Sequence, residues 1–104
     1  MNDDKILGLL GLANRAGYIA AGAMQTEKAI LSGRCKLLLV AEDAAPETQK
    51  RLHIMIDESG IPMFKVLSKL QLGTAVGKSP KAALAINDIG FASSLRRLVS
   101  SDGV

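Results

Sequence analysis

Two segments of this chain are apolar at every position, and they limit the fold more than any other feature does. Residues 37–41 read Leu-Leu-Leu-Val-Ala, and residues 82–86 read Ala-Ala-Leu-Ala-Ile. A strand without polar alternation has both faces buried, which is typical of a sheet covered by helices on each side. We therefore expect buried strands over residues 36–41 and 82–87.

Helical spacing, capping residues and glycines divide the rest of the chain. Asn2 or Asp3 can cap a first helix that stops at Gly17. Pro46 suits the first turn of a third helix, because its missing N–H costs nothing there. The expected helices span residues 3–16, 24–32, 44–59, 68–76 and 88–99, and the further strands span residues 18–21 and 61–67.

Strands and helices thus alternate along the whole chain. This order predicts an α/β fold with a central sheet between helices. No repeat, low-complexity stretch or linker interrupts it, so residues 1–104 are expected to form one domain. Residues 100–104 are expected to be a frayed tail.

Composition excludes several classes of protein. The 104 residues include one cysteine, Cys35, so an intrachain disulfide is impossible. There is no signal-peptide pattern and no apolar run of about 20 residues, so we expect a cytoplasmic protein with no membrane partner. One histidine and one cysteine are too few for a zinc cage built from the protein alone. We expect no metal and no cofactor.

Basic residues gather in the C-terminal part of the chain. Residues 60–104 contain six Lys and Arg and two Asp, a net charge of +4. Residues 1–59 contain seven Lys and Arg and eight Asp and Glu, a net charge of −1. Residues 60–87 contain no acid and four lysines, Lys65, Lys69, Lys78 and Lys81. Such a stretch would attract a polyanion such as nucleic acid. The alternative is an ordinary solvated lysine surface.

No enzyme signature is complete. The glycines near the N-terminus match neither a dinucleotide-binding loop nor a phosphate loop. His53 lies in an expected helix and is interpreted as solvated, and Cys35 opens a buried strand and is interpreted as a core residue. Glu42 and Asp43 follow that strand, at the sheet edge where α/β folds bind ligands. The preferred alternative is that Asp43 caps the third helix. We therefore expect a protein that is not an enzyme.

A segment that begins with glycine carries the strongest functional signal. It reads Gly22-Ala-Met-Gln-Thr-Glu-Lys28-Ala-Ile-Leu-Ser-Gly33 and is followed, after a strand, by Ala41-Glu-Asp-Ala-Ala-Pro46. A glycine before a helix leaves the N–H groups of the first turn free for an anionic or carbonyl-rich partner. Lys28 lies one turn after Met24 on the same helix face.

These motifs resemble the ribosomal L-seven-Ae family of kink-turn RNA binders, whose pattern is Gly-Ala-Asn-Glu-x-x-Lys, a strand, and then Ala-Glu-Asp-x-x-Pro. A second segment, Ser68-Lys-Leu-Gln-Leu-Gly73-Thr-Ala-Val-Gly77, is similar to the family's Ser-Lys-x-x-Leu-Gly-x-Ala-x-Gly. The resemblance covers about residues 5–99. Residues 9–15 and 88–92 look most like the bacterial YlxQ-like branch, whose members are described as ribosomal proteins.

The resemblance implies a three-layer α/β/α sandwich with a central mixed sheet of about four strands. It also implies an RNA site at the N-terminus of the second helix and the loop after Gly77. Met24 and Gln25 stand where the family has the Asn and Glu that read sheared G·A pairs. Gln25 can still hydrogen-bond a base edge, whereas Met24 can only pack or stack. Ser68 and Gly73 are interpreted as residues of the fold, a helix cap and a packing glycine.

The predicted RNA interface combines the second helix, the start of the fourth helix and the loop after it. It comprises Gly22, Ala23, Met24, Gln25, Lys28, Lys69, Lys78, Ser79 and Lys81. The expected partner is structured RNA, ribosomal RNA above all, with ribosomal proteins as neighbours, and the expected state is a monomer. The alternative function is a protein-interaction adaptor on the same fold that has lost RNA binding.

Overall fold

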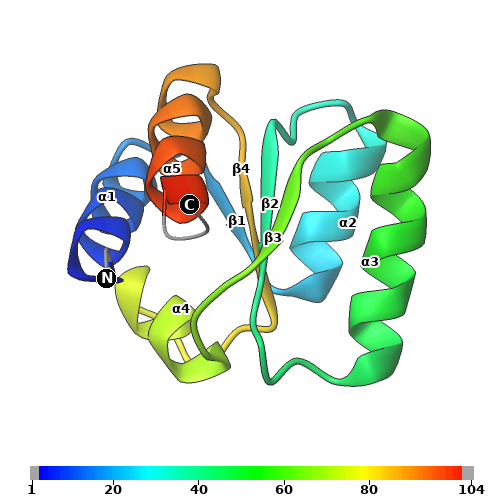
Figure 1. The fold of residues 1–104 in the computed structure, drawn as a ribbon, viewed down its shortest axis with the longest axis horizontal. Coiled ribbons are helices and arrows are strands. Elements are labelled where there is room, and N and C mark those ends of the chain that lie inside the picture. The colour runs from blue at the N-terminus through cyan, green and yellow to red at the C-terminus, as the bar shows by residue number, and fades with distance from the viewer. Residues whose placement is uncertain (1–2, 102–104) are drawn as a thin grey trace.

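A central four-stranded sheet organises the molecule (Figure 1). The computed structural model describes residues 3–101. The strand order is β1-β4-β2-β3, in which β1 (Ile19–Ala21) and β2 (Leu37–Val40) run antiparallel to β4 (Ala83–Ile86), and β3 (Met63–Lys65) runs parallel to β2. The expected mixed sheet is therefore confirmed.

Helices cover both faces of this sheet (Figure 1). On one side lie α1 (Asp3–Arg15), α4 (Lys69–Ala75) and α5 (Ile89–Ser101), and on the other lie α2 (Ala23–Leu31) and α3 (Pro46–Ser59). α1 packs against α4 and α5, and α2 packs against α3, β1 and β4. The protein is a three-layer α/β/α sandwich, as expected. Within residues 3–101, no helix combines the length and the apolar character needed to cross a membrane.

The two central strands form the middle of the core. Every residue of β2 and β4 is buried, and their register sets Leu38 beside Ala85 and Leu39 beside Leu84. Burying one leucine side chain contributes about 1.5–3 kcal/mol, so these strands are a major source of stability. Both expected buried strands are confirmed.

The start of α4 has a complete capping box. The Ser68 hydroxyl oxygen accepts the N–H of Gln71 at 3.1 Å, and the Gln71 side-chain oxygen accepts the N–H of Ser68 at 2.9 Å. Each bond satisfies an N–H group that would otherwise lack a partner. The interpretation of Ser68 as a helix cap is confirmed.

Most element ends differ from expectation by one or two residues, and those of β3 and α5 are among them. β3 is shorter than the expected strand over residues 61–67, because it lies at the sheet edge and Leu67 turns into the left-handed region with φ 63°. α5 continues to Ser101, so the expectation of a frayed tail over residues 100–104 is wrong for residues 100 and 101, and half-buried Val99 in this last turn packs against the core. Asn2 and residues 102–104 lie outside the described residues.

Candidate nucleic-acid interface

The N-terminus of α2 is open and begins at Gly22. This residue has φ 95° and ψ 160°, a conformation that side chains with a Cβ rarely adopt. Its N–H donates to the carbonyl of Ala83 at 2.8 Å, and its carbonyl accepts the N–H of Thr26 at 2.9 Å. No side chain caps the helix at this end. The N–H groups of the first turn, which starts at half-buried Ala23, are therefore left for solvent or a ligand.

The outer face of α2 presents the predicted side chains to solvent. Met24 is 68% exposed, and Gln25 and Lys28 are also exposed, whereas Thr26 and Ala29 are buried against the sheet. The helix therefore displays a thioether, an amide and an ammonium group on its free side. These groups can pack on a base, hydrogen-bond a base edge and pair with a phosphate, respectively.

Residues 77–81, which we call the lysine loop, lie along α4. The N–H of Lys78 donates to the carbonyl of Gly73 at 2.9 Å, and the N–H of Lys81 donates to that of Lys69 at 3.0 Å. A Cβ at Gly73 would collide with the backbone of Ser79, so only glycine lets the loop come this close. Gly73 is confirmed as a packing residue. Lys78 and Ser79 are exposed, and Lys69 and Lys81 are half-buried.

One side chain joins the lysine loop to α2. A Cβ built on Gly22 would lie 3.6 Å from Cδ of Lys81, so the aliphatic stem of this lysine lies over the glycine. The structure thus brings Gly22, Lys69 and Lys81 together. Lys28 and Lys78 lie farther out, one on the second turn of α2 and the other beside Gly73.

The expectation that Asp43 caps the third helix is wrong. α3 starts at Pro46, with Ala45 at the cap position and no side-chain cap. The Asp43 carboxylate instead accepts the N–H of Lys69 at 2.8 Å. Pro46 has no N–H to offer, whereas the first turn of α4 has free N–H groups. Asp43 therefore anchors the start of α4, a role that sequence reasoning missed because the partner is 26 residues away.

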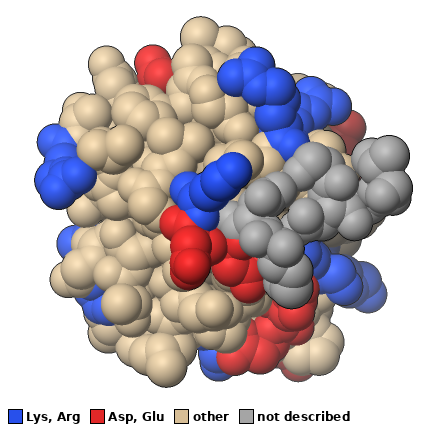
Figure 2. Space-filling view, turned by 60° about the vertical axis from the view of Figure 1, so that its left-hand side comes forward, with Lys and Arg blue, Asp and Glu red and all other residues tan. Residues whose placement is uncertain are grey.

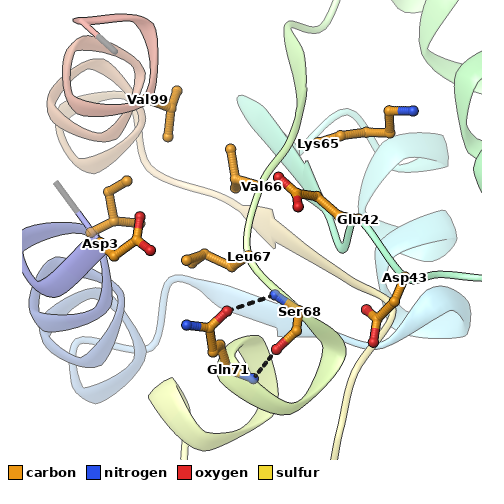
Figure 3. Close-up of a pocket in the computed structure, with 10 residues that line it drawn as sticks. Asp3, Glu42, Asp43, Lys65, Val66, Leu67, Ser68, Gln71 and Val99 are labelled. Atoms are coloured by element: carbon orange, nitrogen blue, oxygen red, sulfur yellow. Dashed lines mark hydrogen bonds between the residues drawn. The ribbon is translucent and has the colours of Figure 1, made fainter. Parts of the chain in front are cut away.

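An acidic pocket borders this interface. It has a volume of about 520 Å³ and lies where α1, α5 and the β3–α4 connection meet (Figure 3). Asp3, Glu42 and Asp43 line it together with a single lysine, Lys65. Among the described residues, no three His, Cys, Asp or Glu could hold a metal ion. Because carboxylates repel phosphates, this pocket limits the surface that can bind an anion.

Most acidic side chains on one face of the molecule lie close together. Figure 2 shows most acidic side chains of the visible face in a band through its lower middle part, with a basic side chain directly against this band and other Lys and Arg side chains elsewhere on the face. The field outside the protein is therefore uneven, and a polyanion would be guided to particular parts of the surface.

The two candidate reactive side chains lie outside the interface. Cys35 is buried just before β2, where its thiol donates to the carbonyl of Leu37 at 3.4 Å. Burial raises the pKa of the Cys35 thiol to about 11, so it stays protonated at neutral pH. His53 is exposed on α3, 3.6 Å from the Asp57 carboxylate. The interpretations of Cys35 as core and of His53 as solvated are confirmed.

The amino-acid sequence matches a known protein family and two relatives. The ribosomal protein L7Ae/L30e/S12e/Gadd45 family matches residues 4–96. The chain belongs to this family. It is 38% identical over 91 residues to the RNA-binding protein YlxQ of Bacillus subtilis strain 168, covering 88% of this chain and 91% of the relative. It is 32% identical over 98 residues to the RNA-binding protein YlxQ of Enterococcus faecium, covering 94% of each.

Solved structures share the fold. A Bacillus halodurans protein of unknown function superposes with a TM-score of 0.88 at 34% identity, over 92% of this chain and 97% of the other. The Giardia lamblia 15.5kD RNA binding protein gives a TM-score of 0.81 over 97% of this chain and 88% of the other, at 24% identity, a likeness of fold alone. The resemblance to the family and to YlxQ is confirmed, and these relationships indicate a binding protein and not an enzyme.

Proposed function

We propose that this protein binds structured RNA through a continuous surface formed by the N-terminus of α2 and the lysine loop. The observation that carries the proposal is the packing of Lys81 on Gly22, because it joins a loop with two lysines to an open helix N-terminus. Lysines that contact phosphates position an RNA, whereas side chains that contact base edges select it. Gln25 takes the second role here, and Met24 packs on a base beside it.

The lysines of this surface are free to meet phosphates. Within the described residues, Lys28, Lys69, Lys78 and Lys81 form no ion pair, since the salt bridges present join Glu27 to Arg51 and His53 to Asp57. A lysine without a carboxylate partner can neutralise a phosphate and release a counterion. The charge needed for RNA binding is therefore available.

The relatives support the class of ligand. Both YlxQ proteins are named as RNA-binding proteins, and the name of the family includes ribosomal proteins. We accordingly propose that the protein is a monomer in the cytoplasm. It associates there with ribosomal RNA, beside ribosomal proteins. We also propose that kink-turn RNA is a ligand. The protein should prefer a kink-turn over a duplex only weakly, because Met24 and Gln25 stand where the family has Asn and Glu.

A salt titration with a charge-matched control tests this proposal. The parent protein should bind a structured RNA in filter assays with a log–log salt slope of about −2 to −4. The double variant Lys78→Ala/Lys81→Ala should bind more weakly and with a flatter slope. Arg34→Ala/Lys36→Ala removes the same charge before β2, at the other end of the sheet, and should change affinity less. Absence of RNA binding by the parent at low salt would contradict the proposal and favour the protein-interaction adaptor.

A further inference from the structure

β3 is an edge strand, and one side of its backbone is unpaired. In the order β1-β4-β2-β3 it has β2 on one side and no described strand on the other. Figure 1 shows β3 in front of the other strands, between α5 and α3, with no described helix or strand in front of it. This edge is not part of the interface proposed above.

The pairing with β2 shows which backbone groups of β3 are free. The carbonyl of Pro62 accepts an N–H of β2 at 3.0 Å, and the N–H of Val66 donates to a carbonyl of β2 at 3.0 Å. In a parallel ladder, alternate residues of a strand bond the same neighbour. Positions 62, 64 and 66 therefore face β2, and the N–H and C=O groups of Met63 and Lys65 face away from the sheet. Both residues offer a donor and an acceptor to an added strand.

A groove runs beside this edge, between β3 and α3. Its volume is about 440 Å³, and it is lined by Pro46, Gln49, Lys50, His53, Met63 and Lys65. Side chains alternate between the two faces along a strand, so Met63 and Lys65 are on the α3 face of the sheet. A strand added to β3 would place every second side chain over this groove.

The groove is basic. Lys50 and Lys65 contribute ammonium groups, His53 contributes an imidazole, and none of the lining residues is an acid. The Asp57 carboxylate lies 3.6 Å from His53, one turn farther along α3, and does not line the groove. Among the described residues, neither lysine forms an ion pair. The groove therefore attracts carboxylates.

Charge favours an acidic partner over a second copy of this chain. A lysine on an edge strand is a common protection against pairing between copies. Two copies joined through β3 would bring two sets of these cations together, whereas an acidic strand would neutralise one set. Lys65 also lines the acidic pocket, but Figure 3 shows its ammonium group pointing away from the carboxylate of Glu42. It is therefore free to meet an acid on the groove side.

The other face of β3 is apolar. Phe64 and Val66 are half-buried and pack against the core. Side chains of an added strand on this face would lie beside Phe64 and Val66, where burial of apolar groups is favourable. The strand that fits this edge therefore alternates acidic and apolar residues.

We infer that the β3 edge binds an extended segment of a partner protein in which acidic and apolar residues alternate. The segment adds a strand through hydrogen bonds to the backbone of Met63 and Lys65, and its carboxylates meet Lys50, His53 and Lys65 in the groove. In this mode of recognition, backbone hydrogen bonds supply affinity and alternate side chains supply specificity. The inference does not depend on RNA binding at α2 and the lysine loop.

Fluorescence anisotropy with synthetic peptides tests the groove. The probe is a short labelled peptide in which glutamate alternates with valine, and the control peptide has lysine in place of each glutamate. The parent should bind the first peptide and not the second. Lys50→Ala/Lys65→Ala should weaken binding of the first about three- to tenfold, because carboxylates lose their partners. Arg34→Ala/Lys36→Ala removes the same charge before β2 and should bind the peptide like the parent.

Hydrogen exchange measured by NMR tests the addition of a strand. With saturating glutamate peptide, the amides of Met63 and Lys65 should exchange at least about tenfold more slowly, because they then donate to the peptide. The Val66 amide already donates to Val40 and should change little. A version of the peptide with N-methylated backbone nitrogens keeps the charges but lacks the donors, so it should bind much more weakly.

Several results would overturn the inference. No strand is added if the glutamate peptide does not bind, or if Met63 and Lys65 exchange at their original rates when it does. Equal binding of the lysine peptide would mean that the groove does not select acids. If Lys50→Ala/Lys65→Ala weakens binding of a structured RNA and leaves peptide binding unchanged, the groove belongs to an RNA surface. Peptide binding by a parent that binds no RNA at low salt would contradict the proposed function and support this inference.

Discussion

The side chain of Lys81 lies over Gly22, where α2 begins. A Cβ built on Gly22 would come within 3.6 Å of Cδ of Lys81, while the N–H of Lys81 donates to the carbonyl of Lys69 at 3.0 Å. The lysine loop therefore bridges α2 and α4. Substitutions that move this loop should alter the interface without removing any exposed side chain.

Gly73→Ala tests the position of the loop. Its Cβ would collide with the backbone of Ser79, which cannot swing away as a flexible side chain could. We expect a loss of about 1–3 kcal/mol in the free energy of unfolding, measured in urea, and weaker RNA binding. Gly8→Ala is the matched control, because Gly8 is an exposed residue of α1 and nothing lies within 4 Å of a Cβ built there. It should stabilise the protein by about 0.5–1 kcal/mol. Equal stabilities for the two variants would contradict the close approach.

Asp43 should stabilise α4 from a distance. Asp43→Ala removes the acceptor of the Lys69 N–H and should lower the free energy of unfolding by about 0.5–2 kcal/mol, the usual cost of losing a helix-capping side chain. Asp43→Asn keeps an oxygen acceptor and should lose less. Glu42→Ala removes an exposed neighbouring carboxylate as a control. If thermal melts show equal losses for Asp43→Ala and Glu42→Ala, the bond to Lys69 does not stabilise α4.

The sequence predicted the fold well because its signals are local. The apolar runs of β2 and β4 are buried along their whole length, and Ser68 caps α4 through Gln71, three residues later. Such patterns lie within a few residues of one another, so periodicity and capping preferences expose them.

The contacts that shape the candidate interface are not local, and most escaped prediction. Asp43 bonds Lys69 across 26 positions, and Asn14 bonds Val76 across 62. The packing of Lys81 on Gly22 depends on how β1 and β4 pair. A resemblance to a family can name such residues, but only the fold shows which of them touch.

Burial of Cys35 should make stability depend on pH in alkaline solution. Its pKa is raised from 9.0 to about 11 in the folded protein, so the folded state holds the proton more tightly than the unfolded state does. This contribution to stability is complete below about pH 9 and is lost as pH rises through about 11. The difference in unfolding free energy between the parent and Cys35→Ala should therefore shrink over that range in urea titrations. A difference that stays constant would mean that the thiol is not shielded from solvent.

Met24 and Gln25 should set how well the protein distinguishes RNAs. Met24→Asn with Gln25→Glu restores the side chains that the family uses on sheared G·A pairs. We expect the preference for a kink-turn over a plain duplex to rise by about 1–3 kcal/mol for each good base contact, measured as a ratio of dissociation constants. Leu31→Asn changes an exposed apolar residue elsewhere on α2 and should leave the ratio unchanged. Equal ratios for the double variant and the parent would argue against base contacts at these positions.

The two lysines of the loop should differ in what they contribute. Lys78 is exposed beside Gly73, so we expect it to contact only the RNA backbone. Lys78→Ala should weaken all RNAs about equally and reduce the salt slope by about one unit. Lys81→Ala should reduce the slope similarly but should also lower discrimination between a kink-turn and a duplex, because its stem lies over Gly22.

Lys28→Ala provides the comparison for that difference. Lys28 lies on the same exposed face of α2 as Met24, so its removal should also lower discrimination. Before RNA binding is measured, circular dichroism and thermal melts should show that each variant is folded. Substitutions of exposed residues usually change stability by less than about 0.5 kcal/mol. If Lys81→Ala and Lys78→Ala lose affinity in parallel for every RNA, Lys81 acts on the backbone alone. Its packing on Gly22 would then position the loop without helping α2 to select among bases.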